Sequence, residues 1–165
     1  MQESQREFLE SLLTTASPSG FETEGQRVWI DYVESFADEV TTDDYGNAVA
    51  VHNGSGEGPE IAFSGHADEI GFIVRDIDDN GFIRISRIGG ADRTVSQGQH
   101  VTIHAGAGPV QGVNGQPAIN PRDTGGEAYH DAAEQLIEIG GRDREAAQQP
   151  DAAGDPITFS RQPVP

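Results

Sequence analysis

The sequence predicts an α/β fold in which a short α/β segment comes first and a small β barrel or sandwich follows it. Three observations support this prediction. Apolar residues recur at helical spacing in two segments before residue 37. After residue 70 the apolar residues gather in short runs typical of strands, and glycine-rich turns separate those runs. The length of 165 residues suffices for one ordinary domain or for one and a half small ones.

Two amphipathic helices are expected at the start of the chain. The first covers residues 2–16 and ends at Ser17-Pro18-Ser19-Gly20, because proline cannot continue a helix and glycine turns the chain. The second runs from Thr23 to about Phe36. Its inward side chains include Trp29 and Tyr32, which are at helical spacing and are interpreted as core residues. The inward residues of the first helix would be Phe8, Leu9, Leu12 and Leu13.

Three short strands follow the helices. Residues 40–42 and 48–52 are expected to be strands on either side of the turn Asp43-Asp44-Tyr45-Gly46-Asn47. After a glycine-rich loop at 53–58, Glu60–Ser64 is expected to be a short buried strand that leads into Gly65-His66-Ala67-Asp68-Glu69. This first part, residues 1–69, has too few elements to cover both faces of a mixed sheet.

The remainder of the chain is predicted to be rich in strands. Residues 70–160 would form one β-rich domain, and residues 161–165 a tail without a helix or strand. The strands are expected at 70–77, 82–88, 100–104, 110–113, 136–139 and 154–159, and the helices at 127–135 and 142–149. Strands of this length and spacing favour a closed or stacked β architecture.

The composition excludes several classes of function. The chain has no Cys, so disulfides, zinc ribbons, iron–sulfur clusters and thiol nucleophiles are excluded. Arginine supplies all ten basic residues against 28 acidic ones, and the net charge of −18 disfavours binding to nucleic acid or to a membrane surface. No apolar run approaches the roughly 20 residues of a membrane span, and no signal peptide is evident, so we expect a cytoplasmic protein.

The acidity has two interpretations. An acidic disordered segment is one, and a folded protein adapted to strong salt is the other. The carboxylates alternate with apolar residues and do not form blocks, which favours folding. At molar salt the Debye length is only about 3 Å, so dense surface carboxylates repel one another little. We therefore expect a halophilic protein.

The strongest local signal for chemistry is Ser64-Gly65-His66-Ala67-Asp68-Glu69-Ile70-Gly71. His66 and Asp68 are two residues apart, so both side chains point to the same side of an extended stretch. A carboxylate beside an imidazole fixes the tautomer of a metal-binding histidine and raises its basicity. The spacing alone is also compatible with an ordinary surface turn. Glu69 could line the same crevice or be a solvated turn carboxylate.

Several motifs together resemble one enzyme family. Residues 64–75, SGHADEIGFIVR, are similar to the first metal-ligand motif of the dinuclear zinc aminopeptidases that include glutamyl aminopeptidase and the tetrahedral (TET) aminopeptidases. Some members of that family are named endoglucanase. The other similar motifs, in chain order, are Ser17–Glu22, Asp43–Asn47, Asn80–Phe82, Ile88–Gly90, Gln111–Val113 and Ile137–Gly140.

The resemblance implies an aminopeptidase-like α/β catalytic domain, present here in part, followed by a β-barrel-like dimerisation domain inserted into it. It implies that His66 is a ligand of zinc or cobalt in a dinuclear site and that Asp68 is the catalytic residue that orients it. The substrates would be short peptides, and the β-rich domain would mediate a homo-oligomer. In such enzymes the metals activate a water and polarise the peptide carbonyl, while a glutamate acts as the general base.

The same resemblance places the remaining ligands and the general base beyond the inserted domain, where this chain stops. We therefore expect a truncated enzyme that is inactive alone, since each ion of a dinuclear site needs roughly three protein donors. Asn114 stands where the family has an apolar residue, and Asn120 where it usually has His. These departures leave the packing and assembly of the β-rich domain open.

Two other functions remain as alternatives. The chain could be a non-catalytic remnant or interaction module that self-associates through its β-rich half. A carbohydrate hydrolase would need two carboxylates facing a cleft, and nothing in the sequence singles out such a pair. Among further candidates, His100 and His104 share a strand face without an acidic partner at ligand spacing. Asp76, Asp78 and Asp79 lack the spacing of a calcium loop and are interpreted as a solvated hairpin tip.

Overall fold

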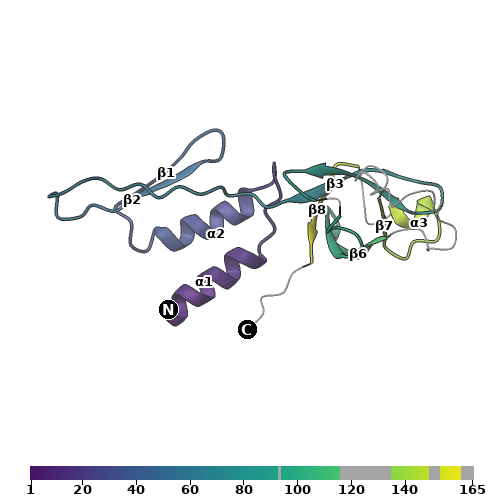
Figure 1. The fold of residues 1–165 in the computed structure, drawn as a ribbon, viewed down its shortest axis with the longest axis horizontal. Coiled ribbons are helices and arrows are strands. Elements are labelled where there is room, and N and C mark those ends of the chain that lie inside the picture. The colour runs from purple at the N-terminus through teal and green to yellow at the C-terminus, as the bar shows by residue number, and fades with distance from the viewer. Residues whose placement is uncertain (93, 116–134, 149–152, 161–165) are drawn as a thin grey trace. The chain divides into compact units, whose positions relative to one another are not determined.

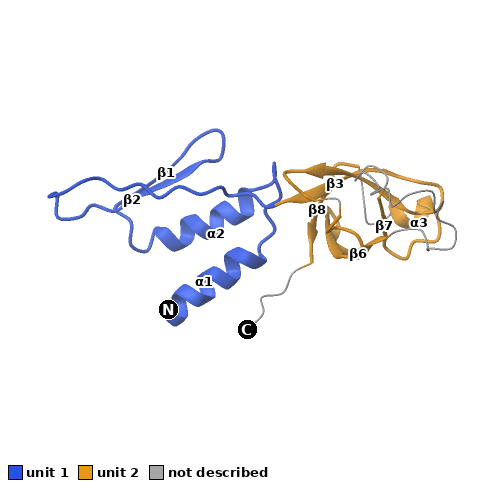
Figure 2. Ribbon diagram, viewed as in Figure 1, with its two compact units in different colours: residues 1–69, 162–165 blue, residues 70–161 orange. Residues whose placement is uncertain are grey.

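Two helices and a β-hairpin form the first part of the chain, and a β-barrel with a short helix forms the second, in the computed structural model shown in Figure 1. The structure describes residues 1–92, 94–115, 135–148 and 153–160. The chain divides into two units: unit 1 contains Met1–Glu69, and unit 2 begins at Ile70 (Figure 2). The mixed α/β class with a β-barrel is thus confirmed.

Unit 1 begins with helices α1 (Glu3–Thr14) and α2 (Thr23–Val33), which pack against each other. The ring of Phe8 stacks on that of Tyr32 with 3.8 Å between the ring centroids. None of the residues of α1 is completely buried, and the expected inward residue Leu13 is 64% exposed. Trp29 and Tyr32 are half-buried, not enclosed core residues.

The hairpin of unit 1 consists of β1 (Glu39–Thr42) and β2 (Ala48–Val51), as the sequence predicts. The turn between them is shaped by Asp43, whose carboxylate accepts hydrogen bonds from the backbone N–H groups of Tyr45 and Asn47, both at 2.9 Å. The Asn47 side-chain amide donates a third bond to it. These bonds lower the pKa of Asp43, because they stabilise the ionised carboxylate.

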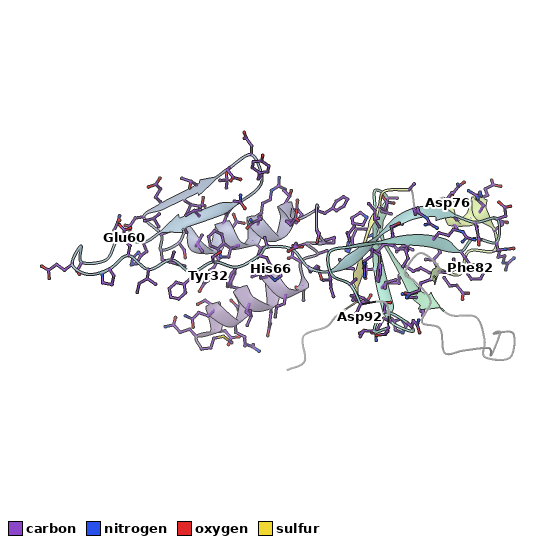
Figure 3. All side chains as sticks on the ribbon, turned by 45° about the horizontal axis from the view of Figure 1, so that its top comes forward. Tyr32, Glu60, His66, Asp76, Phe82 and Asp92 are labelled. Atoms are coloured by element: carbon purple, nitrogen blue, oxygen red, sulfur yellow. The ribbon has the colours of Figure 1, made fainter. Side chains whose placement is uncertain are left out.

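The expected buried strand at Glu60–Ser64 is wrong. The segment makes no strand, and its apolar side chains are open to solvent, with Ile61 73% and Phe63 96% exposed. The physical reason is pairing: a strand needs backbone partners on a neighbouring strand, and in unit 1 the hairpin β1–β2 is a sheet of its own. His66 therefore lies on an extended, exposed segment and not at the tip of a buried strand (Figure 3).

Unit 2 is a closed antiparallel barrel of six strands in the order β3-β4-β7-β6-β5-β8. The bounds are β3 (Gly71–Ile77), β4 (Ile83–Ile88), β5 (His100–Ala105), β6 (Gly108–Gly115), β7 (Leu136–Glu138) and β8 (Pro156–Phe159), with the short helix α3 (Arg144–Gln148) after β7. Each of these elements overlaps a segment expected from the sequence. The expected helix at 127–135 lies outside the described residues except for Gln135, which is not helical.

The core of the barrel is made of the inward residues of these strands. Phe72 of β3 is fully buried and meets the ring of Phe159 edge to face. A bulge in β3 between Val74 and Asp76 shifts the alternation, so that Ile77 points inward and Asp76 stays exposed. The remaining buried aliphatic residues include Val74, Ile83, Ile85, Val101, Ile103, Ile137 and Ile157.

Asn114, a polar residue where an apolar one was expected, is accommodated in the barrel by a polar partner. It is fully buried, and its side-chain amide donates a 2.7 Å hydrogen bond to Oε1 of Gln135. The same Gln135 oxygen accepts a 2.7 Å bond from the hydroxyl of Ser96. Both partners are buried as well, so the Asn114 amide nitrogen is satisfied, whereas its buried Oδ1 has no hydrogen-bond partner among the described residues. Asn120 lies outside the described residues.

Candidate functional site

The candidate site of unit 1 is the segment around His66 and Asp68, which the structure brings together as the sequence predicts. Nδ1 of His66 lies 2.9 Å from Oδ1 of Asp68 and 2.9 Å from the backbone oxygen of the same residue. The His66 side chain is 86% exposed, and that of Asp68 is 35% exposed. The ring is therefore held through Nδ1, while its body faces solvent (Figure 3).

A serine that sequence reasoning missed completes this arrangement. The hydroxyl of Ser19 donates a hydrogen bond to Oδ2 of Asp68, the carboxylate oxygen that His66 does not use. The pKa of Asp68 is lowered, first by this bond from Ser19 and then by the bond from His66, because both stabilise the ionised form. Asp68 is thus held as a carboxylate between a hydroxyl and an imidazole.

Backbone hydrogen bonds join residues 17–19 to residues 68–69. Pro18 and Glu69 form a parallel bridge in which Glu69 N–H donates to the Ser17 oxygen at 2.8 Å and Ser19 N–H donates to the Glu69 oxygen at 3.2 Å. The Glu69 carboxylate accepts a 3.0 Å bond from Ser17 N–H. Glu69 therefore joins its segment to residues 17–19 and is not a free, solvated turn carboxylate.

The signal for Ser19 was present in the sequence as the turn Ser17–Glu22, which stops α1. Ser17 and Pro18 are buried, and Ser17 lies against Gly25 of α2. A methyl group on Gly25 would be 2.0 Å from the Ser17 hydroxyl oxygen. The turn thus packs on α2 through small residues and presents Ser19 toward Asp68.

A second histidine in unit 1, His52, has the same kinds of partner at Nδ1 as His66, a backbone oxygen and a carboxylate oxygen. Nδ1 of His52 lies 3.1 Å from the backbone oxygen of Phe36 and 3.3 Å from Oδ2 of Asp38. The same Oδ2 of Asp38 accepts a 2.6 Å bond from the N–H of Asn53, so this carboxylate is engaged with the backbone. Within the described part of the chain, no serine hydroxyl donates a hydrogen bond to Asp38. His52 is therefore a natural comparison for His66, with a similar pair of partners at Nδ1 but without the serine.

The other candidates have structural roles. His104 shares a 2.9 Å hydrogen bond with the Thr158 hydroxyl on the outside of the barrel. Asp76, near the end of β3, and Asp79, in the β3–β4 turn, are exposed as expected and form ion pairs with Arg144 of α3. Asp78 departs from the expected solvated tip, because its side chain is only 19% exposed and accepts hydrogen bonds from the N–H groups of Asn80 and Phe82. His130 lies outside the described residues.

The described part of the chain does not assemble a complete metal centre. In the ranges 1–92, 94–115, 135–148 and 153–160, no group of three His, Asp or Glu side chains is placed to hold an ion. The residues present fit a single ligand position, His66, with its support, Asp68. A dinuclear site needs further donors. No helix in the same ranges is long and apolar enough to cross a membrane.

Comparison with known proteins gives one consistent family. Residues 46–165 match the M42 glutamyl aminopeptidase family. The lysyl aminopeptidase of Pyrococcus furiosus is 30% identical over 148 residues, which are 87% of this chain and 42% of that protein. The chain thus spans less than half the length of this relative.

Solved structures agree with this result. A TET aminopeptidase from a marine sediment Thaumarchaeota archaeon superposes with a TM-score of 0.86 and 30% identity, over 95% of this chain and 45% of that one. The TET1 peptidase of Pyrococcus horikoshii, described as assembling into a tetrahedron or a large octahedral shell, has a TM-score of 0.76 and 27% identity, over 93% and 46% of the chains. A Thermotoga maritima structure named an endoglucanase has a TM-score of 0.72 and 25% identity, over 92% and 44%.

Proposed function

Because the chain belongs to the M42 glutamyl aminopeptidase family, we propose that it supplies the amino-terminal part of a metal-dependent aminopeptidase that acts on short peptides in the cytoplasm. In this proposal His66 is a ligand of zinc or cobalt and Asp68 orients its ring. Unit 1 is then part of the catalytic domain, and the barrel of unit 2 is the inserted dimerisation domain.

One observation supports the ligand role above all others. Both neighbours of His66 Nδ1 are oxygen acceptors of Asp68, which leaves Nε2 as the nitrogen available to a metal. This is the usual arrangement behind a metal-binding histidine, where a carboxylate fixes the tautomer and raises the basicity of the ring. The bound metals would supply an activated water and a polarised peptide carbonyl.

We further propose that this 165-residue chain does not hydrolyse peptides by itself. In the ranges that the structure describes, one imidazole with a supporting carboxylate does not provide the roughly three donors that each ion requires. The same reasoning predicts weak zinc binding, because a single exposed ring gives little affinity. Endoglucanase activity is only the name of a similar structure, and no observation on this chain favours it.

The test uses the purified chain in high salt. With zinc or cobalt added, we expect no hydrolysis of aminoacyl anilides and no stoichiometric zinc after dialysis. In nuclear magnetic resonance (NMR) spectra, we expect millimolar zinc to shift Nε2 of His66, and His66→Ala to remove that response. Turnover that His66→Ala abolishes would contradict the proposed inactivity, and a zinc response confined to other residues would contradict the ligand role.

We also propose that unit 2 mediates self-association. The similar TET1 peptidase of Pyrococcus horikoshii assembles into large shells. On the barrel unit of this chain, Ile70, Val95 and Val113 are exposed apolar residues, and the last belongs to strand β6. Analytical ultracentrifugation in high salt should show a dimer or a larger species. A chain that sediments as a monomer at tens of micromolar would argue against this role.

A further inference from the structure

The role of Ser19 follows first from the hydrogen-bond chemistry of the His66 ring. The two atoms in reach of Nδ1, the carbonyl and the carboxylate oxygens of Asp68, accept hydrogen bonds and cannot donate them. Nδ1 must therefore carry the hydrogen, and in the neutral ring Nε2 carries the free electron pair. A solvent-exposed histidine without such partners would sample both tautomers and several ring orientations.

The second step concerns what holds Asp68. Its side chain is 35% exposed, so packing alone does not fix its two torsion angles. One carboxylate oxygen faces His66, and the other accepts the hydrogen bond from the Ser19 hydroxyl. Because each carboxylate oxygen of Asp68 has a hydrogen-bond partner, the orientation of the carboxylate plane is fixed. With Ser19 removed, only the exposed imidazole would remain as its side-chain partner.

The third step is that Ser19 is placed without the help of its hydroxyl. Its N–H donates to the Glu69 oxygen, and Glu69 is in turn bonded to Ser17 by its N–H and its carboxylate. The neighbouring Ser17 and Pro18 are buried. Replacing Ser19 by alanine therefore removes one hydroxyl group and leaves the backbone attachment in place.

From these contacts we propose that Ser19 is a positioning residue, which fixes the Asp68 carboxylate and, through it, holds the His66 ring in the Nδ1–H tautomer with Nε2 presented outward. The inference rests on the proposed ligand role of His66 for its functional meaning. The hydrogen-bond relay itself is a property of the free chain. It can therefore be tested without metal and without activity.

The experiment records ¹⁵N–¹H correlations of the histidine rings in the metal-free 165-residue chain, at high salt and about pH 8.5, where an ordinary histidine is neutral. In the unmodified chain we expect His66 as the Nδ1–H tautomer. In Ser19→Ala we expect a mixture with a substantial Nε2–H fraction. Ser19→Thr, which keeps the hydroxyl, should restore the single tautomer.

Two controls separate positioning from a general loss of structure. His52, which has a carbonyl and a carboxylate partner of its own, should give the same signals in every variant. Ser35→Ala, which removes the hydroxyl bond to the Tyr32 oxygen elsewhere in unit 1, should leave His66 unchanged. The amides of Ser19 and Glu69, which donate to backbone oxygens, should exchange at the same rate in Ser19→Ala as in the unmodified chain.

The outcomes distinguish this inference from the proposed function. A single Nδ1–H tautomer in Ser19→Ala overturns the role of Ser19, whatever zinc does. A zinc titration of the unmodified chain that leaves His66 Nε2 unaffected contradicts the ligand role, even where the tautomer responds to Ser19→Ala as expected. Changes at His52 as large as those at His66 would show that the substitution disturbs unit 1 as a whole, and would also overturn the inference.

Discussion

Gly25→Ala tests how the turn that presents Ser19 is packed against α2. In a helix interior the substitution stabilises by about 1 kcal/mol, and Gly25, the third residue of α2, gains at most that amount. Here the new methyl group would lie 2.0 Å from the hydroxyl oxygen and 3.1 Å from Cβ of Ser17, a buried residue. We therefore expect the substitution to destabilise unit 1.

The magnitude follows from two opposing effects. Overpacking a filled site typically costs about 1–3 kcal/mol, and an approach of 2.0 Å is well inside van der Waals contact. Subtracting the gain in helix propensity leaves a net loss of up to about 2 kcal/mol in the free energy of unfolding. In the double variant Ser17→Ala/Gly25→Ala, the closest atom is gone and the remaining approach is 3.1 Å, so most of the loss should be recovered.

The assay can be restricted to unit 1, because Trp29 of α2 is the single tryptophan of the chain. Denaturant unfolding followed by Trp29 fluorescence should give a lower midpoint for Gly25→Ala than for the unmodified chain. The double variant should lie between them. A Gly25→Ala midpoint equal to or above that of the unmodified chain would refute the packing argument, since it would mean that Ser17 moves aside without cost.

Three further predictions concern the barrel, the pH and the salt dependence. Gly112→Ala should cost about 1–3 kcal/mol in unit 2, measured by amide exchange, because its methyl group would lie 2.7 Å from Ile137. Gly115→Ala, with its nearest atom 3.7 Å away, should be nearly neutral. The pKa of Asp43 is lowered in the folded chain by its bonds to Asn47 and the turn backbone. The ionised Asp43 therefore stabilises the fold above the pKa that it has in the unfolded chain, and this stabilisation is lost as the pH falls through the lower pKa of the folded chain. Asp43→Asn should make the acid unfolding curve flatter in that pH range. The melting temperature should rise with KCl, and a flat or falling series would contradict halophily.

The sequence predicts correctly those elements that have a regular pattern of buried residues or that are held by hydrogen bonds between near neighbours in the chain. β5 alternates buried and less buried residues over its length, β4 does so over its first four residues, and this period is visible without any tertiary information. The turn around Asp43 is equally local, since its hydrogen bonds join residues no more than four apart. The position of Asp76 shows the limit of such patterns. A bulge in β3, which depends on the partner strand, decides that Ile77 and not Asp76 points inward.

The prediction at Glu60–Ser64 failed because apolar composition indicates where a strand can form, not whether a neighbour is present to pair with it. Ile61 and Phe63 have the spacing of one strand face, yet both are exposed in unit 1. The sequence predicted only the part of the candidate site that depends on contacts between near neighbours in the chain. His66 and Asp68 are two residues apart and meet locally, whereas Ser19 reaches Asp68 from 49 residues away, and no local pattern contains that pairing.

These two dependences explain how the His66 ring can be oriented on a segment that is otherwise exposed. The residues before His66 rely on partners for their burial, and in unit 1 they are exposed. The residues after it are attached by the bonds between Ser17 and Glu69, and their side chains are ordered by Ser19. The orientation of the His66 ring therefore depends on hydrogen bonds within unit 1 and not on a completed sheet. In the proposed ligand role of His66, further metal donors would meet a ring that already has its tautomer and direction, which would lower the entropic cost of forming the centre.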